Sequence, residues 1–478
     1  MADRNAAPAG AKRVSDEGEG HPIKKLLMYA SPALGLAMLA PPVSGQTPDL
    51  PESGVSAADS NVQRTENAAA IAYLMDAFGL TSEEAATRID REAKAEAMLE
   101  LSADLAGEAW AGASIDHADG GTVRLHATSE EAAKLIATQQ LPKWAIVEVV
   151  PRSLADLRRL REDLGEFIRV SLTGDLERLP EDEARSSLAK LERQGWRANL
   201  DIASNAVVVS VAAESDEVLR LAEEFARLRA GDSSLPSIVV KSVEGLDLTP
   251  TSDDCPTQAG GCIPLRGGVD LQRSDLTPWC TTGFTFTRAG ARFTSSADHC
   301  NPGQPWKHAD QVIGDVAWNQ TSPPVDAMMI RVNDNGLWKA ANMVWRPGNP
   351  DFRITSQISS PNNSLQGITI CHVGRGLPAN GFGAESCGPL TSIDGQNAPS
   401  WKNPTWDGLG VAAYRQCGGD SGGPVFNGAT GRAYGLVRGR TNANGANCSV
   451  GGQGGVEAMF SWVSQVEAAS GYDVVLTS

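Results

Sequence analysis

Cysteine is missing from the first 254 residues of this 478-residue chain, and all eight cysteines lie at or after Cys255. The chain also lacks a surplus of basic residues. Its formal net charge is −17, which argues against a nucleic-acid partner. The apolar run near the N-terminus, "LLMYASPALGLAMLA", is short for a transmembrane helix and is interrupted by Pro32. We therefore expect no nucleic-acid or membrane partner, and we expect any disulfides in the C-terminal half.

Charge and glycine divide the chain into two unlike parts. From Cys255 onward there are 15 acidic and 15 basic residues, so the whole acidic excess lies before Cys255. Of the 49 glycines, 33 lie after it. The length allows two or three domains. We expect an acidic, helix-forming part followed by a neutral, turn-rich, cysteine-bearing part.

Residues 1–45 have the pattern of a leader with an export signal. Lys24 and Lys25 precede the apolar run, and the small residues before Gln46 suit a cleavage site for signal peptidase. An internal amphipathic segment is the alternative. Export would bring the cysteines into an oxidising compartment, where cysteines form disulfides. The expected localisation is extracellular, as a secreted protein.

An internal repeat lies within residues 46–228. Segments 114–135 and 199–221 each predict a strand, a tight turn, a second strand and a helix. Ser129 and Ser215 stand where the N-caps of the two helices belong. This order of elements predicts an α+β domain.

The rest of this domain predicts helices without a catalytic pattern. A capping box at 81–84 opens a helix that runs to about Leu101. His117 and His126 lie in the first hairpin, where we expect surface or packing roles. The polar segment 229–254 follows, and we expect it to be a linker that contains a processing site.

Residues 255–478 predict an all-β domain. Short β-prone runs such as "TTGFTFT", "GITICHV" and "AYGLVRG" alternate with glycine, proline and asparagine. Regular turn signals between short strands favour a sandwich or a barrel. A helix is predicted only near the end, over 457–470.

The segment "CGGDSGGPVF" presents Ser421 between glycines. The nucleophile elbow of α/β-hydrolases needs a histidine after the serine, and no histidine follows Ser421. A subtilisin-like serine opens a helix, and Gly-Gly-Pro-Val-Phe is a poor helix start. The remaining order is His…Asp…Ser. His299 ends a β-prone run and Asp326 opens an apolar strand, so the chain supplies that order.

These motifs resemble those of the bacterial chymotrypsin-fold serine proteases, the streptogrisin and α-lytic protease group. The resemblance rests on His299-Cys300, Val325-Asp326-Ala327, "ICHVGRG" (370–376) and "CGGDSGGPVF". The hairpin stretch "AGEAWAGASIDHADGGTVRLHA" resembles the pro-region of the same group. The fold implied is multidomain: an all-β double β-barrel, chymotrypsin-like protease domain preceded by an α+β pro-domain.

The resemblance implies a secreted serine endopeptidase, made as a precursor and acting on polypeptide substrates. Its own pro-domain would act as an intramolecular chaperone and inhibitor, and the protein would be a monomer without cofactor or metal. His299 would be the base, Asp326 would orient it, and Ser421 would be the nucleophile. The amides of Gly419 and Ser421 would form the oxyanion hole. A catalytically silent binding module and an anchored adhesion protein are the alternatives.

Other candidates for these roles remain open at this stage. His308 and His372 are the other histidines of the domain, and Asp315 competes with Asp326. The resemblance also implies the disulfides, which are Cys280–Cys300, Cys371–Cys387 and Cys417–Cys448, with Cys255–Cys262 as an additional N-terminal bridge.

The chain departs from the family pattern in three places. Asp298 replaces the usual glycine before the base, and His372 replaces an arginine that usually pairs with the aspartate before the nucleophile. Asp420 could then pair with His372, with Arg375 or with a new N-terminus. The usual Ser-Gly-Gly of the pocket wall is Arg438-Gly439-Arg440 here, and Arg415 precedes the nucleophile loop. These four residues are expected at the specificity pocket, where the arginines would favour an acidic side chain or point to solvent.

Overall fold

The computed structural model describes residues 67–174, 196–212, 216–229, 238–243, 247–250, 265–273, 278–300, 305–308, 311–333, 340–346, 352–398, 406–442, 448 and 457–476. The expected export leader and the Cys255–Cys262 bridge lie outside the described residues. No helix in these stretches is long and apolar enough to cross a membrane.

Each repeat of the N-terminal region has one more strand than the sequence predicts. The first consists of β1 (Trp110–Asp116), β2 (Thr122–Ala127), α4 (Glu130–Ala137) and β3 (Ala145–Val149); the second consists of β4 (Trp196–Asp201), β5 (Ala206–Ala212), α7 (Asp216–Arg229) and β6 (Ile238–Val243). β3 pairs with β2, and β6 pairs with β5, both in parallel. A helical crossover is what brings such a parallel strand beside its predecessor. β6 falls inside the segment 229–254 that the sequence predicts as a linker.

The described part of this region also contains the helices α2 (Ala68–Phe78), α3 (Ser82–Ala106) and α5 (Leu154–Gly174). The predicted capping box is confirmed, because the amide of Thr81 donates to Glu84 (2.8 Å) and the amide of Glu84 donates to the Thr81 hydroxyl (3.3 Å). Ser129 caps α4 by accepting from the amide of Ala132, whereas Ser215 lies outside the described residues. His117 and His126 are both buried, so neither has a surface role.

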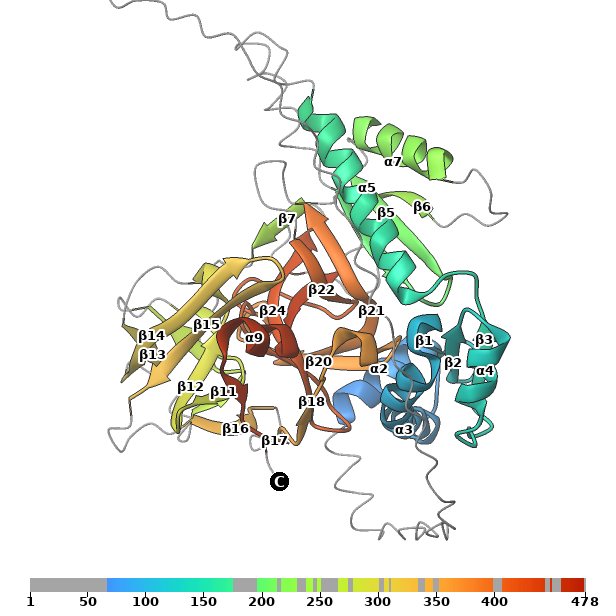
Figure 1. The fold of residues 1–478 in the computed structure, drawn as a ribbon. Coiled ribbons are helices and arrows are strands. Elements are labelled where there is room, and N and C mark those ends of the chain that lie inside the picture. The colour runs from blue at the N-terminus through green and yellow to red at the C-terminus, as the bar shows by residue number, and fades with distance from the viewer. Residues whose placement is uncertain are drawn as a thin grey trace, which may run out of the picture. The chain divides into compact units, whose positions relative to one another are not determined.

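The first sheet of the C-terminal domain is curled (Figure 1). The buried core of this part includes Leu271, Trp306 and Ile330. Its strands, in spatial order, are β10 (Pro278–Thr281), β9 (Asp270–Gln272), β13 (Trp306–His308), β14 (Gln311–Ser322), β15 (Val325–Val332), β12 (Ala291–Ser296), β11 (Thr285–Arg288) and β26 (Asp473–Val474). A small sheet of β17 (Phe352–Arg353), β16 (Ala340–Val344) and β8 (Leu265–Gly267) accompanies it.

The second barrel is closed. Its strands, in spatial order, are β20 (Thr369–Val373), β23 (Pro424–Asn427), β24 (Arg432–Asn442), β25 (Ala458–Trp462), β22 (Trp406–Ala412) and β21 (Glu385–Ala398). β21 pairs back onto β20, where Cys371 stands opposite Cys387. The closed barrel and the curled sheet confirm the predicted chymotrypsin-like double-barrel fold, preceded by an α+β region.

The predicted C-terminal helix starts later than expected. Residues 458–462 form β25, in which every side chain is buried, and α9 (Val463–Ser470) begins only after them. The prediction of a helix over 457–470 is wrong for the first part of this segment. Residues 458–462 form a strand because β22 and β24 lie on either side and hydrogen-bond to both of its edges. Tertiary pairing overrides local helical propensity here.

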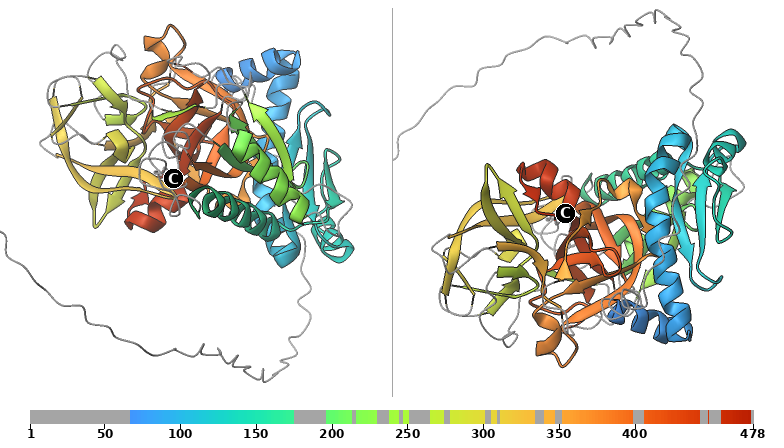
Figure 2. Two further views of the ribbon diagram at one scale, coloured as in Figure 1. Left: turned by 90° about the horizontal axis from the view of Figure 1, so that it is seen from above. Right: turned by 90° about the horizontal axis from the view of Figure 1, so that it is seen from below.

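Three strands from the N-terminal region and the predicted linker pair with the C-terminal domain. β4 joins β21 in antiparallel fashion, and β1 pairs with β19 (Leu365–Gln366) in parallel. β7 (Asp247–Pro250) pairs antiparallel with the end of β24. Helix α2 contacts β20 and β21 of the second barrel, and α3 contacts the adjacent strand β19. Both views in Figure 2 show these helices beside the second barrel.

Candidate active site

The structure brings His299, Asp326 and Ser421 into one chain of hydrogen bonds. Nε2 of His299 lies 2.9 Å from Oγ of Ser421, and Nδ1 lies 2.7 Å from Oδ2 of Asp326. The main-chain amide of His299 donates to the other oxygen, Oδ1, at 3.1 Å. Asp326 is therefore bound to both the ring and the backbone of His299. With Nδ1 donating to the carboxylate, Nε2 is the ring nitrogen that can accept a hydrogen bond from the Ser421 hydroxyl.

Each of these side chains is positioned by a different element. His299 lies in a short 3-10 turn, η3 (Asp298–Cys300), which is separated from the end of β12 by one residue. Asp326 is the second residue of β15, and its amide donates to the Ser461 hydroxyl of β25 (3.0 Å). β15 pairs with β12, so the two elements that carry His299 and Asp326 are neighbours in the first sheet. Ser421 comes from the second barrel, in the loop before β23.

Glycine is required on both sides of Ser421. Gly419 and Gly422 have φ values of +94° and +83°, in the left-handed region that disfavours other residues. A Cβ at Gly422 would stand 2.1 Å from Oγ of Ser296, so the nucleophile loop closely approaches the end of β12. Thr281 holds the loop from behind: its amide donates to the carbonyl of Ser421, and its hydroxyl donates to that of Gly419.

Asp420 is fully buried, and main-chain amides bind its carboxylate. Oδ2 accepts from the amide of Cys417 (2.7 Å), and Oδ1 accepts from those of Gly376 (2.7 Å) and Leu377 (3.3 Å). Burial raises the pKa of Asp420, while nearby His372 and the amides oppose that shift. Three amide donors thus take the place of the partner arginine of the family pattern.

Neither basic residue considered as a partner for Asp420 hydrogen-bonds to it. His372 Nε2 donates to the carbonyl of Arg415 at 2.7 Å and lies 4.0 Å from the Asp420 carboxylate. Burial lowers the pKa of His372, which keeps the ring neutral near pH 7. Arg375 instead forms a buried ion pair with Asp270 (3.0 Å), which joins the second barrel to the first.

Arg438 also approaches the Asp326 carboxylate. Its Nε lies 3.7 Å from Oδ2 of Asp326, and its guanidinium carbon lies 3.7 Å from the centre of the Trp406 ring. Burial alone would raise the pKa of Asp326, but the contacts with His299 and Arg438 outweigh it and hold the pKa below its ordinary value. Burial lowers the pKa of Arg438 to about 10, so the guanidinium remains charged at neutral pH.

The other residues expected at the specificity pocket have partners other than Asp326. Arg415 stacks its guanidinium on Phe382, with 3.9 Å from the guanidinium carbon to the ring centre. Gly439 and Arg440 are paired along β24 with residues of β25 and β7. His308 Nδ1 faces the carbonyl of Asp270 (2.8 Å). Asp315 is exposed on β14, opposite Arg331.

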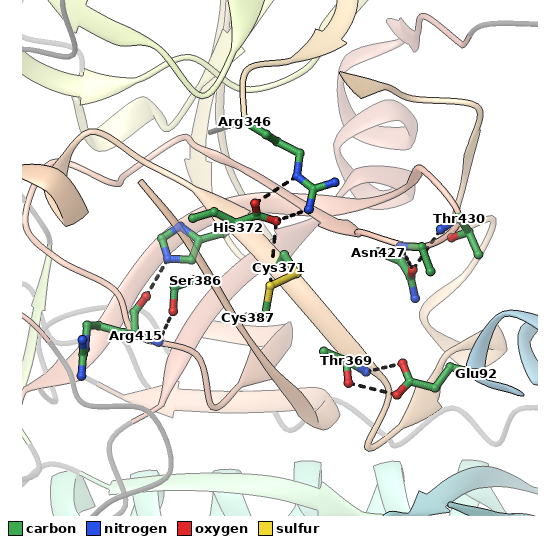
Figure 3. The surroundings of a disulfide bond; sticks show 12 residues. Glu92, Arg346, Thr369, Cys371, His372, Ser386, Cys387, Arg415, Asn427 and Thr430 are labelled. Carbon is green, nitrogen blue, oxygen red and sulfur yellow. Dashed lines mark hydrogen bonds and ion pairs between the residues drawn. A yellow bond between two sulfur atoms is a disulfide. The ribbon is translucent and has the colours of Figure 1, made fainter. Parts of the chain in front are cut away.

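Among the described residues, three disulfides are present: Cys280–Cys300, Cys371–Cys387 and Cys417–Cys448. The first ties η3, next to His299, to β10. The third closes onto the nucleophile loop. Figure 3 shows the second, which staples β20 to β21 beside the ion pair of Arg346 and Glu385 (2.7 Å).

Glu385 and the two sulfurs of Cys371 and Cys387 are the one group of potential metal ligands found among the described residues. The sulfurs are joined to each other, and Arg346 already neutralises Glu385. Both features make this group a poor ligand set, since thiolates are what bind metal.

Thr281, Ser461 and Trp406 complete the site, and sequence reasoning missed all three. Thr281 and Ser461 form hydrogen bonds with residues more than a hundred positions away in the sequence. The guanidinium of Arg438 stacks on the ring of Trp406. No motif marks them, because each contacts the site only in the folded protein: Thr281 and Ser461 across the two barrels, and Trp406 within the second barrel.

No protein-family model matches the chain, and no curated protein sequence matches it. Several solved structures align with it. One is described as a glutamic acid-specific serine protease that uses a histidine triad in substrate binding (21% identity, 44% of this chain, 100% of that chain, TM-score 0.35). Others are Thermobifida fusca protease A and Cellulomonas bogoriensis chymotrypsin (each 20% identity, 45% of this chain, 100% of that chain, TM-score 0.34).

Proposed function

We propose that this protein is a secreted serine endopeptidase made as a precursor, with residues 255–478 as the protease domain. The observation that carries the proposal is the pair of hydrogen bonds that His299 makes, 2.9 Å to Ser421 and 2.7 Å to Asp326. A serine hydroxyl is a weak nucleophile until a base removes its proton, and an imidazole next to a buried carboxylate is suited to that task.

The reaction would follow the acyl-enzyme route. As Oγ of Ser421 bonds to the scissile carbonyl carbon, its proton moves to Nε2 of His299, and Asp326 stabilises the imidazolium. The C–N bond then breaks, and His299 returns the proton to the leaving amine. A water molecule attacks the acyl-enzyme with His299 again as the base, which releases the acid product and restores Ser421.

The amides of Gly419 and Ser421 would bind the oxyanion that forms in both steps. In support, Thr281 binds the carbonyls of these same two residues from behind, which fixes the orientation of the loop. The positive φ of Gly419 gives the main chain the turn that such a pocket needs. One donor of this kind typically contributes about 3 kcal/mol to transition-state stabilisation.

The N-terminal region would serve as folding template and inhibitor of the protease domain. Barrels built from distant strands fold slowly, which an attached template can relieve. Two contacts support this role: α3 places Glu92 against Thr369 of β20, and α5 places Arg158 on Asp394 of β21 at 2.8 Å. β4 also extends the sheet of the second barrel, because it pairs with the last residues of β21.

Strand β7 supports the inhibitory part of the proposal. Pro250 stands opposite Gly439, and Thr249 stands opposite Arg440. A chain that lies antiparallel on this end of β24 is one residue from Arg438, and so it is close to Asp326. We infer that β7 occupies the position of a substrate strand until the segment 229–254 is processed.

Fluorophosphonate labelling tests the activity. The secreted protein should be labelled, and labelling should be lost in Ser421→Ala and in His299→Ala. N-terminal sequencing of the labelled species should give a start after β7, and the secreted precursor should begin at Gln46 or later. An unlabelled protein that is folded and processed would contradict the proposal.

A catalytically silent binding module is the second candidate, and Arg438 is the observation that favours it. A cation beside Asp326 weakens the stabilisation that the carboxylate offers to an imidazolium. A peptide-library digest distinguishes the two candidates, because a binding module would retain peptides without cleaving them.

A further inference from the structure

We propose that Arg438 is a positioning residue that acts on His299 through Asp326. Its positive charge keeps the imidazole unprotonated down to a lower pH than in a site without Arg438. The consequence for activity rests on the proposed function, whereas the effect on the protonation of the His299 ring does not depend on it.

A β-bulge aims Arg438 at the site. Along β24 and β25, Val437 stands opposite Phe460 and Gly439 stands opposite Met459, so Arg438 is an extra residue without a partner on β25. A bulge of this kind redirects the side chain that it carries, and bulges are frequent next to active sites. A regular register would have left no extra residue here.

The ring of Trp406 holds the guanidinium in place. The guanidinium carbon lies 3.7 Å from the ring centre, and Trp406 is only 3% exposed. Nε of Arg438 is buried and makes no hydrogen bond to the described residues, so it faces the carboxylate as a charge. The Arg438 side chain is itself only 15% exposed, which limits screening by solvent.

Arg438 and His299 face the same oxygen. Oδ2 of Asp326 is 2.7 Å from Nδ1 of His299 and 3.7 Å from Nε of Arg438. A protonated His299 would therefore share its counter-charge with a permanent cation and lie close to it. Like charges at this separation disfavour protonation of the weaker base. The imidazole is the weaker base, because arginine stays charged in proteins.

The other polar groups around His299 lie on elements other than the strand that carries Arg438. Asp298 of η3 accepts a hydrogen bond from Thr321 of β14, Asp326 belongs to β15, and Ser421 belongs to the nucleophile loop. Arg438 comes from a separate element, β24, and is the cation that contacts the Asp326 carboxylate beside His299. Its removal is therefore a clean electrostatic test.

The direct test is an NMR titration of the His299 ring in the full-chain precursor, with Ser421→Ala to prevent self-cleavage. The signal is assigned by its loss in His299→Gln. Adding Arg438→Gln should raise the midpoint of the titration by about one pH unit. Adding Arg438→Lys should leave it near that of the parent, since a lysine keeps the charge. Equal midpoints in the parent and in Arg438→Gln would overturn the proposal.

Arg438→Ser is the second variant, which removes the charge with a smaller side chain if glutamine disturbs the bulge. The His308 ring, buried against Asp270, reports whether the fold is kept. In the active protein, the acid limb of the kcat/KM profile should move by the same amount as the NMR midpoint. A lower plateau with an unmoved acid limb would show a structural role only. Absence of fluorophosphonate labelling at every pH would reject the proposed function, whereas the NMR midpoints would still decide the role of Arg438.

Discussion

The carboxylate of Glu92 accepts two hydrogen bonds from Thr369, 277 positions further along the chain. The main-chain amide of Thr369 donates at 2.8 Å and its hydroxyl at 2.9 Å, and all of these groups are buried (Figure 3). Helix α3 is thereby fixed to the first residue of β20, the strand that closes the second barrel. A buried contact of this kind is strong because loss of the carboxylate leaves a main-chain donor unsatisfied.

Glu92→Ala should destabilise the full-chain Ser421→Ala precursor by about 1–3 kcal/mol, the usual cost of an unsatisfied buried donor. The measurement is urea unfolding followed by tryptophan fluorescence. Asp90→Ala is the matched control on the same helix, since Asp90 is exposed and its ion-pair partner among the described residues is exposed Lys94 (2.7 Å). The control should change stability by less than about 0.5 kcal/mol. Equal losses in the two variants would contradict a docking role for Glu92.

Glu96 should make the stability of the precursor depend on pH. It is buried, it accepts a hydrogen bond from Tyr434, and burial raises its pKa above the ordinary 4.5. The folded state then binds a proton more readily than the unfolded state, so the contribution of Glu96 is lost as pH rises from about 4.5 through the folded pKa.

Glu96→Gln is uncharged at every pH and isolates this effect. The free energy of unfolding of the Gln variant, minus that of the Ser421→Ala parent, should increase between pH 5 and pH 8. Urea unfolding at several pH values measures it, and the other buried carboxyls cancel in the difference. A difference that stays constant over this range would show that Glu96 does not titrate within it.

Gly422→Ala should abolish fluorophosphonate labelling. An added Cβ would lie 2.1 Å from Oγ of Ser296, so the nucleophile loop would have to move away from the end of β12. Gly290→Ala is the matched control, because Gly290 has a similar φ of +79° but no atom within 4 Å of the added Cβ. In the control, the strain of a left-handed non-glycine residue should lower the free energy of unfolding by about 1–2 kcal/mol, and the protein should still be labelled. Normal labelling of Gly422→Ala would show that the loop tolerates this displacement.

Removal of Cys280–Cys300 should affect both stability and labelling. The two cysteines are 20 positions apart, and closing such a loop contributes about 3 kcal/mol in the chain-entropy model. Replacing both by alanine should also slow labelling, because Cys300 lies next to His299. The matched control is the pair Cys371 and Cys387, 16 positions apart and remote from η3 in sequence. Its loss should lower stability by a similar amount and leave the labelling rate of the folded fraction unchanged.

Local features of the chain were predictable from sequence because their causes are local. The capping box at Thr81 depends on residues within one turn, and the hairpin turns depend on short glycine- and asparagine-containing segments. The order of His299, Asp326 and Ser421 was readable since each lies in a short, specific motif. The structure joins their side chains by hydrogen bonds, and their catalytic roles remain a prediction.

Features that depend on pairing over long distances were not readable. The third strand of each repeat and the start of α9 at Val463 follow from which edges are available for hydrogen bonding. The amide partners of Asp420 depend on how the loop after β20 packs against the nucleophile loop. Sequence could only offer charged side chains as partners, since every residue except proline has a main-chain N–H and none of them is marked as a donor to Asp420.

The sequence by itself determined the division into an acidic α+β part and a cysteine-bearing β part, and the residue types available for an acyl-transfer site. Only the tertiary structure decided where the arginines point: Arg375 to Asp270, Arg415 to Phe382 and Arg438 to Asp326. The physical reason is that a long, charged side chain goes wherever a buried carboxylate or a ring face compensates its desolvation. That partner is set by strand register, and a one-residue bulge is enough to change it.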